Sequence, residues 1–176
     1  DYVMEFCDKY ENIKRPFICQ SRADTICSHP DVFKTMKEVG LKMLLIGFES
    51  GNQRILNLLR KGTKVEQNYE AAEICHELGI EIWANYMLGI PTETKEEAMK
   101  TIDMIRTMKP EWPSPAFFTP IVGTDLYDYC KKNDLIISED PAVIGTRAPT
   151  RPKIKGIDYD WLSKQVIYAT TLKDRS

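Results

Sequence analysis

Three polar side chains stand where apolar segments of the sequence end, and each is of a type that binds small ligands. Arg22 follows the first apolar segment, Glu49 directly follows the second, and Asn85 lies inside the third. A guanidinium binds a carboxylate through two parallel hydrogen bonds, and a carboxylate among apolar residues needs donors such as hydroxyl or ammonium groups. We therefore predict that these three side chains gather around one small ligand.

Each of these residues also has a purely structural alternative, which the sequence leaves open. Arg22 could pair with Asp24 or with Glu49 instead of a ligand. Glu49 could cap the helix that starts near Asn52, because the helix dipole favours an acid there. Asn85 could satisfy backbone groups at its own strand end.

A glycine segment and a lysine add backbone access and positive charge to this set. Gly89, Ile90 and Pro91 follow the third apolar segment, and a rigid extended segment there could form an edge against a planar ring. Lys61 could approach an anionic group, although a solvated lysine between two helices is the alternative. The acidic residues that follow fit the first turn of a helix: Glu93, Glu96 and Glu97.

Strand-like and helix-like patterns alternate along the chain. Apolar segments predict strands at residues 17–20, 43–48, 80–88 and 114–119, and the second should be buried on both faces because it is continuous. Helices are predicted before, between and after them, two of them opened by capping-box pairs: Thr63 with Glu66, and Thr94 with Glu97. Beyond Asn133 only the apolar residues from Tyr159 to Ile167 predict a further short helix.

This alternation predicts an α/β protein with a parallel sheet built from right-handed crossovers. Polar or glycine residues follow every predicted strand, and in such sheets the carboxyl ends of the strands hold the ligand. Because four strands cannot close an eight-stranded barrel, the sheet is either a partial β/α barrel or a doubly wound open sheet.

Composition excludes several classes of function. The 176 residues carry a formal net charge of -2 with 43% hydrophobic and 28% charged residues, which gives no broad cationic surface for nucleic acid. We expect no membrane span, because the longest apolar stretch is far shorter than the ~20 residues required. Five scattered cysteines predict reduced, cytoplasmic thiols rather than disulfides or a metal loop. Glycine-rich dinucleotide loops, phosphate loops, zinc-protease helices and nucleophile elbows are absent from the sequence.

Five short motifs, in this order and spacing, resemble the radical S-adenosylmethionine (radical SAM) superfamily. The likeness covers about residues 2–132 and is closest to the subgroup that often carries a cobalamin-binding domain before the radical SAM core. The motifs are Ser21-Arg22-Ala23-Asp24, Gly47-Phe48-Glu49-Ser50-Gly51, Leu59-Arg60-Lys61-Gly62-Thr63, Met87-Leu88-Gly89-Ile90-Pro91-Thr92-Glu93-Thr94 and Pro120-Ile121-Val122-Gly123-Thr124-Asp125-Leu126-Tyr127.

The resemblance implies that residues 1–133 are the C-terminal portion of an incomplete six-stranded β/α barrel, with residues 134–176 as a tail or the start of a following region. S-adenosylmethionine would lie across the strand ends, bound to a 4Fe-4S cluster. Arg22 and Glu49 would reach its methionyl or ribose groups and Lys61 its carboxylate. Asn85 would meet the ribose, and Gly89, Ile90 and Pro91 would flank the adenine.

One part of the family pattern is absent from the chain. The superfamily's Cys-x-x-x-Cys-x-x-Cys cluster loop does not occur, and none of the five cysteines substitutes for it. We therefore expect the cluster loop and two strands upstream, so that the intact enzyme cleaves S-adenosylmethionine reductively while this chain alone is inactive. Cobalamin would favour methyl transfer, and without it hydrogen abstraction, rearrangement or thiolation would be open.

Two further hypotheses remain at this point. The chain could be a small β/α barrel protein that binds a phosphorylated metabolite with Glu49 as a general base, or a non-catalytic scaffold that binds a partner through an unpaired sheet edge. In the radical SAM hypothesis the partners are the cofactor and an unknown small-molecule substrate. The exposed edge of an incomplete barrel also predicts self-association.

Overall fold

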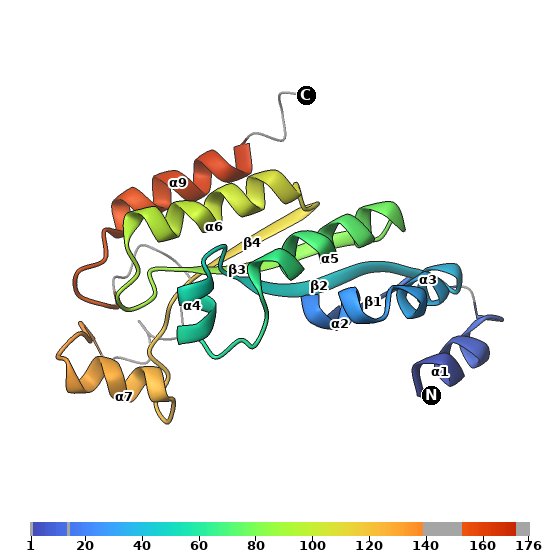
Figure 1. The fold of residues 1–176 in the computed structure, drawn as a ribbon, viewed down its shortest axis with the longest axis horizontal. Helices are drawn as coiled ribbons and strands as arrows, with labels where there is room; N and C mark the ends of the chain where they lie inside the picture. Colours follow the sequence, from blue (N-terminus) through green and yellow to red (C-terminus); the bar gives the residue numbers. More distant parts are fainter. Residues whose placement is uncertain (1, 14, 139–152, 172–176) are drawn as a thin grey trace. The chain divides into compact units, whose positions relative to one another are not determined.

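A computed structural model describes residues 2–13, 15–138 and 153–171 of the chain (Figure 1). Helices and strands alternate over most of this length, as predicted. In chain order they are α1 (Tyr2–Tyr10), β1 (Phe17–Ser21), α2 (Ala23–Ser28), α3 (Pro30–Glu38), β2 (Leu41–Glu49), α4 (Gln53–Leu58), α5 (Val65–Glu77), β3 (Glu81–Leu88), α6 (Lys95–Met108), β4 (Trp112–Phe117), α7 (Asp125–Lys132) and α9 (Tyr159–Thr171).

The strands form a four-stranded sheet in the order β1-β2-β3-β4. β1 and β2 are parallel, with Ile18 opposite Met43 and Ser21 opposite Ile46, and the register shifts between Phe17 and Ile18. Because each strand neighbours the one that follows it in the sequence, a helix-containing connection links every neighbouring pair. This arrangement confirms the predicted α/β class with a parallel sheet.

The described residues fall into two compact units, each assembled from several stretches of chain. The first unit comprises residues 1–48, 63–85 and 108–114, and the second comprises residues 49–62, 86–107 and 115–176. The predicted division between residues 133 and 134 stays a prediction. Within the predicted tail, residues 139–152 and 172–176 lie outside the described residues.

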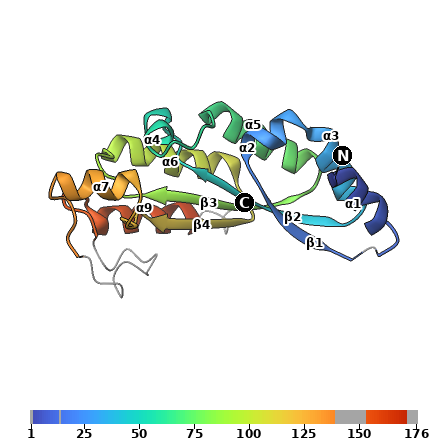
Figure 2. The same ribbon diagram turned by 90° about the horizontal axis from the view of Figure 1, so that it is seen from below.

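In the first unit, α2, α3 and α5 lie on one side of β1 and β2 (Figure 2). Leu44, Ile46 and Phe48 of β2 are fully buried, whereas Met43 and Leu45 on the alternate positions are only partly buried. The prediction that this strand is buried on both faces is therefore only partly confirmed. A continuous apolar run gives no information about whether a second layer covers the other face.

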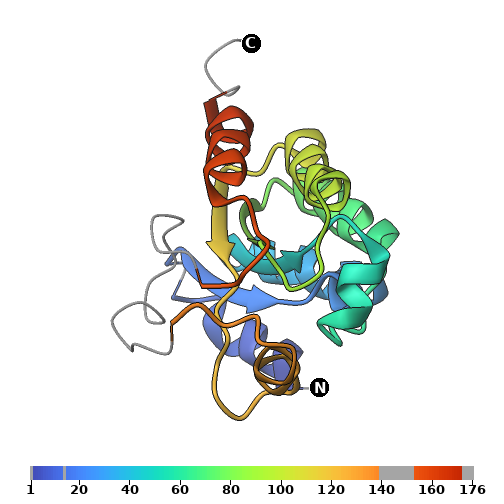
Figure 3. The ribbon, with the colours of Figure 1, turned by 90° about the vertical axis from the view of Figure 1, so that its left-hand side faces the viewer.

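In the second unit, α9 runs alongside α6 and β4 (Figures 1 and 3). Lys95 at the start of α6 donates to Asp158 at 2.7 Å, and its ammonium lies 5.1 Å from the centroid of the Trp161 ring. One apolar cluster in this unit consists of five buried residues: Ile55, Ile90, Phe118, Cys130 and Ile154. The helix predicted from the apolar residues between Tyr159 and Ile167 is present as α9.

Some predicted boundaries were wrong. α2 was not predicted, because polar residues 21–24 read as a loop, whereas Ser28 donates to the carbonyl of Asp24 inside a short helix. The capping pair Thr63 with Glu66 is displaced by one residue: Gln67 accepts from the amide of Lys64 at 2.8 Å. β4 covers residues 112–117 rather than the predicted 114–119, so Pro115 lies inside the strand instead of near its start.

No helix in the described ranges combines the length and the apolar composition that a membrane span needs.

Candidate functional site at the ends of strands β2 and β3

The turn after β2 carries an ion pair that is largely shielded from solvent. The Nζ of Lys61 donates to Oε1 of Glu49 at 3.0 Å, and the two side chains are only 19% and 22% exposed. Glu49 also has a left-handed backbone conformation, with φ of 62°. Few residues other than glycine adopt this region, and those that do are enriched at functional sites.

The helix-cap alternative for Glu49 is excluded, because Asn52 performs that role. Oδ1 of Asn52 accepts from the amides of Arg54 at 2.9 Å and Ile55 at 3.3 Å, which satisfies the first turn of α4. The alternative for Lys61, a solvated side chain between helices, is likewise excluded by its pairing with Glu49.

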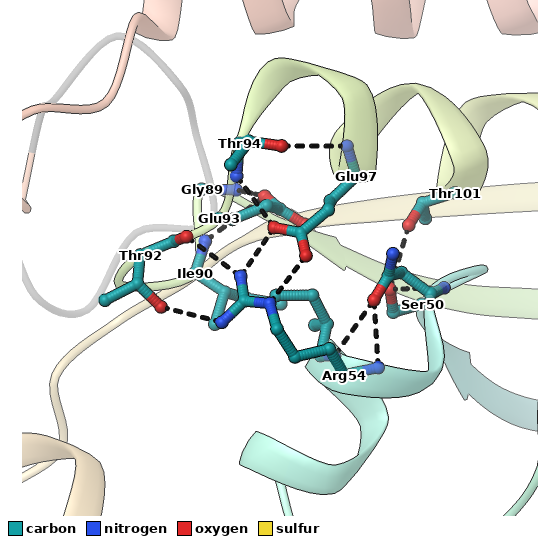
Figure 4. Close-up of polar contacts among 11 residues, drawn as sticks. Ser50, Arg54, Gly89, Ile90, Thr92, Glu93, Thr94, Glu97 and Thr101 are labelled. Atoms are coloured by element: carbon teal, nitrogen blue, oxygen red, sulfur yellow. Dashed lines mark hydrogen bonds and ion pairs between the residues drawn. The ribbon is translucent and has the colours of Figure 1, made fainter.

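Buried hydroxyl groups fix this turn to α6 (Figure 4). The hydroxyls of Ser50 and Thr101 lie 3.0 Å apart, and both residues are fully buried. The amide of Gly51 donates to Oγ1 of Thr101 at 3.0 Å, and the amide of Asn52 donates to Oγ of Ser50 at 3.1 Å. The backbone on which Glu49 sits is therefore held in place by a helix that is remote in the sequence.

The turn after β3 is held by a carboxylate. Oε2 of Glu93 accepts from the amides of Gly89 at 2.7 Å and Ile90 at 3.4 Å (Figure 4). Gly89 has φ of 69°, and Gly89, Ile90 and Pro91 are all buried. A methyl group added at Gly89 would lie 3.3 Å from Cγ2 of Ile157, so this side of the turn is closely packed. A planar ring would have to contact the remaining edge of the segment.

The carboxyl group of Glu93 is itself unusual. Burial raises the pKa of Glu93 to about 7, although the two backbone amides oppose this shift. Its second oxygen, Oε1, is buried and has no hydrogen-bond partner among the described residues. Near neutral pH the Glu93 carboxyl is therefore partly protonated, and this is the same group that accepts from the Gly89 and Ile90 amides.

Arg54 and Glu97 complete the polar contacts around this turn (Figure 4). Arg54 donates to both carboxylate oxygens of Glu97, with Nε 2.6 Å from Oε1, and it also donates to the carbonyl and the hydroxyl of Thr92. Hydrogen bonding to Arg54 lowers the pKa of Glu97 to about 2. Glu97 further accepts from the amide of Thr94 at 3.0 Å, which confirms the predicted capping box.

Sequence reasoning missed this cluster. It interpreted Glu93 as a first-turn acid and Glu97 as a first-turn acid and capping residue, whereas Glu93 turns back to the glycine segment and Glu97 also pairs with an arginine 43 residues away in the sequence. The capping-box pattern of Thr94 and Glu97 was the one local signal for it. Nothing in the local sequence marks Arg54 as the partner.

Arg22 and Asn85, the two predicted site residues of the first unit, have different surroundings. Arg22 donates to Asp24 through Nε at 3.0 Å and Nη2 at 2.8 Å, so the pairing with Asp24 left open by the sequence is present. The same contact lowers the pKa of Asp24. Asn85 occupies the partly exposed face of β3, between the buried residues Ala84 and Tyr86. The predicted gathering of Arg22, Glu49 and Asn85 stays a prediction.

The described cysteines do not form a metal site. All five are free thiols, and three are buried: Cys7, Cys75 and Cys130. Burial raises the pKa of Cys27 to about 11 and that of Cys75 to about 12, which disfavours the thiolate form that binds metals. Within the described ranges no three histidine, cysteine or acidic side chains are placed to share a metal ion. These residues therefore do not fit an iron-sulfur cluster.

The chain is similar to a known protein family and to several known proteins. A family model described as the radical SAM superfamily matches residues 2–105. An uncharacterized methyltransferase of Pyrococcus horikoshii is 28% identical over 156 residues, which are 89% of this chain and 33% of that protein. The chain therefore spans about a third of this relative's length.

Two solved structures share the fold. Elp3 of Methanocaldococcus infernus has a TM-score of 0.55 at 24% identity, with 69% of this chain and 29% of that chain covered. OxsB, a cobalamin-dependent S-adenosylmethionine radical enzyme, has a TM-score of 0.54 at 18% identity, with 98% and 26% covered. At these identities the similarity shows the fold alone.

Proposed function

Since the chain belongs to the radical SAM superfamily, we propose that it is the S-adenosylmethionine-binding part of an enzyme that cleaves this cofactor reductively to start radical chemistry. The observation that carries the proposal is the Glu49–Lys61 ion pair at the end of β2, on a strained and anchored turn. A carboxylate beside an ammonium offers both an acceptor and a donor to a ligand that carries an amino acid group and hydroxyls.

The residues of the second unit fit the cofactor in a chemically specific way. Among the described residues, Lys61 is the hydrogen-bonding partner of the Glu49 carboxylate and binds it through Oε1. This leaves Oε2 as an acceptor for an ammonium or a ribose hydroxyl, while Lys61 would bind the methionyl carboxylate. The backbone of Gly89, Ile90 and Pro91 would flank the adenine. Arg22 and Asn85, by their positions in the motifs, are proposed as further polar contacts.

The cluster ligands are proposed to come from sequence outside these 176 residues, which lack the three-cysteine loop. The relative's greater length supports this proposal. When bound, the 4Fe-4S cluster supplies the electron for cleavage, and the residues of this chain orient the cofactor and exclude water. Similarity to a methyltransferase and to the OxsB fold supports methyl transfer with cobalamin as the finer hypothesis.

Formation of 5′-deoxyadenosine tests this function. We expect the intact protein, reconstituted with iron and sulfide and reduced under anaerobic conditions, to release it from S-adenosylmethionine, whereas the 176-residue chain treated identically releases none. Liquid chromatography with mass spectrometry measures the product. Release of 5′-deoxyadenosine by the 176-residue chain alone would refute the proposal that the cluster ligands lie outside it. Absence of this product from a fully reconstituted intact protein would refute the proposed function.

The Glu49–Lys61 pair gives a second prediction. In the intact protein, Glu49→Gln or Lys61→Met should weaken S-adenosylmethionine binding about tenfold or more, because each change leaves a shielded charge without its partner and removes one ligand contact. Equilibrium dialysis measures the dissociation constant. Arg60→Gln is the matched control, since Arg60 pairs with Asp125 through side chains that are 80% and 70% exposed. Equal affinity in all four proteins would contradict the assignment.

A further inference from the structure

Thr92 has a backbone conformation that its own side chain disfavours. Its φ is 69°, in the left-handed region, and a β-branched residue is a genuine outlier there. Such conformations persist only where the surrounding structure enforces them, and they concentrate at ligand sites. Because Thr92 directly follows Pro91, its conformation sets the direction of the chain between the Gly89–Pro91 segment and α6.

Two sets of contacts hold this conformation: the amide of Glu93 donates to the carbonyl of Ile90 at 2.9 Å, and Arg54 donates to Thr92. Nη1 donates to the hydroxyl of Thr92 at 3.1 Å, and Nη2 donates to its carbonyl at 2.9 Å. Nε and Nη2 also donate to the two carboxylate oxygens of Glu97, whose side chain is only 15% exposed. One planar group therefore links α4, the turn after β3 and the first turn of α6.

We propose that Arg54, paired with Glu97, is a positioning residue that keeps the Gly89–Pro91 segment in its ligand-binding shape before any ligand arrives. The inference rests on the proposed function in one respect, namely that this segment flanks the adenine of S-adenosylmethionine. Pre-forming the segment saves the entropy that a ligand would otherwise lose in ordering it.

The geometry requires arginine in particular. The three nitrogens of the guanidinium are divided between the partners: Nη1 donates to Thr92, Nε donates to Glu97, and Nη2 donates to both. A lysine ammonium is a single point of donation on a flexible chain and cannot hold both partners in one plane. α4 is itself rigid, because Asn52 caps it and the preceding turn is bonded to Thr101. Arg54 thus projects from a fixed base.

Hydrogen–deuterium exchange on the intact protein, without added ligand, tests the clamp. In Arg54→Gln and in Arg54→Lys we expect the amides of residues 89, 90 and 92–94 to exchange about tenfold faster than in the wild type, while residues 101–107 of α6 keep their rates. Glu97→Gln should act in the same direction. Arg60→Gln, which changes an exposed arginine of the same region, should leave the exchange of this segment unchanged.

Binding of S-adenosylmethionine to the same proteins tests the consequence. The dissociation constant should rise about tenfold in Arg54→Gln, with Arg54→Lys between it and the wild type. Unchanged exchange in the Arg54 variants would overturn the clamp, and unchanged affinity despite faster exchange would overturn its role in binding. Failure of the wild type to bind S-adenosylmethionine would refute the proposed function instead, and the exchange rates would still decide whether Arg54 holds the segment.

Discussion

Gly51→Ala is expected to destabilise the protein by about 3 kcal/mol or more, because the new methyl group has no space. An ideal Cβ at this position would lie 2.3 Å from the carbonyl oxygen of Lys100 and 2.7 Å from its carbonyl carbon. These are backbone atoms inside α6, so relief requires moving the helix and breaking the hydrogen bond from the Gly51 amide to Thr101. Urea denaturation followed by circular dichroism measures the loss.

Gly123→Ala separates the clash from the general effect of removing a glycine. Gly123 has φ of 87° and no atom within 4 Å of an added Cβ, so it has conformational strain without a steric conflict. Gly123→Ala should lower the free energy of unfolding by only about 1 kcal/mol. Equal losses in the two variants would show that close packing of the β2 turn against α6 is not what requires a glycine at position 51.

The free energy of unfolding is expected to depend on pH through Glu93. Burial raises the pKa of this carboxyl to about 7 from an ordinary value of 4.5. The folded protein therefore keeps a proton on Glu93 at pH values where the unfolded chain has already released it. The contribution to stability is then fully present below about pH 4.5 and is lost as the pH rises to about 7. The shift corresponds to roughly 3 kcal/mol as an upper limit.

Glu93→Gln should remove this dependence. The free energy of unfolding of the wild type minus that of the variant should fall between pH 4.5 and 7, and should be flat above and below this window. Glu96→Gln is the matched control, because Glu96 is fully exposed and its pKa is lowered, so it does not titrate in the window. A difference curve for Glu93 that is as flat as the control's would contradict the raised pKa.

Most of the fold was predictable because its signals are local. β2 and β3 were found from runs of apolar residues, and α6 from the reciprocal pattern of Thr94 and Glu97, which the structure confirms. The short helix α2 was missed because its six residues are too few for periodicity to show. The displaced start of α5 reflects a choice between adjacent caps that local sequence does not decide.

The candidate site was predictable in position but not in its contacts. Motif order placed Glu49 and the Gly89–Pro91 segment at strand ends and Lys61 between two helices, and the structure has Lys61 reach Glu49 from the loop between α4 and α5. It did not reveal that Lys61 pairs with Glu49, or that Glu93 turns back onto Gly89. The sequence predicted Lys61 to be near an anionic group or solvated and Glu93 to be a first-turn acid, and spacing alone does not identify their partners.

Periodicity, capping residues and motif order were therefore enough to establish the α/β class, the superfamily and the two turns that matter. These properties depend on neighbours within a few residues, or on order along the chain. The contacts that give the turns their shape needed the folded molecule: Arg54 with Thr92 and Glu97, and Gly51 against Lys100. They join residues about forty to fifty positions apart, and such pairs meet only after strands and helices have packed.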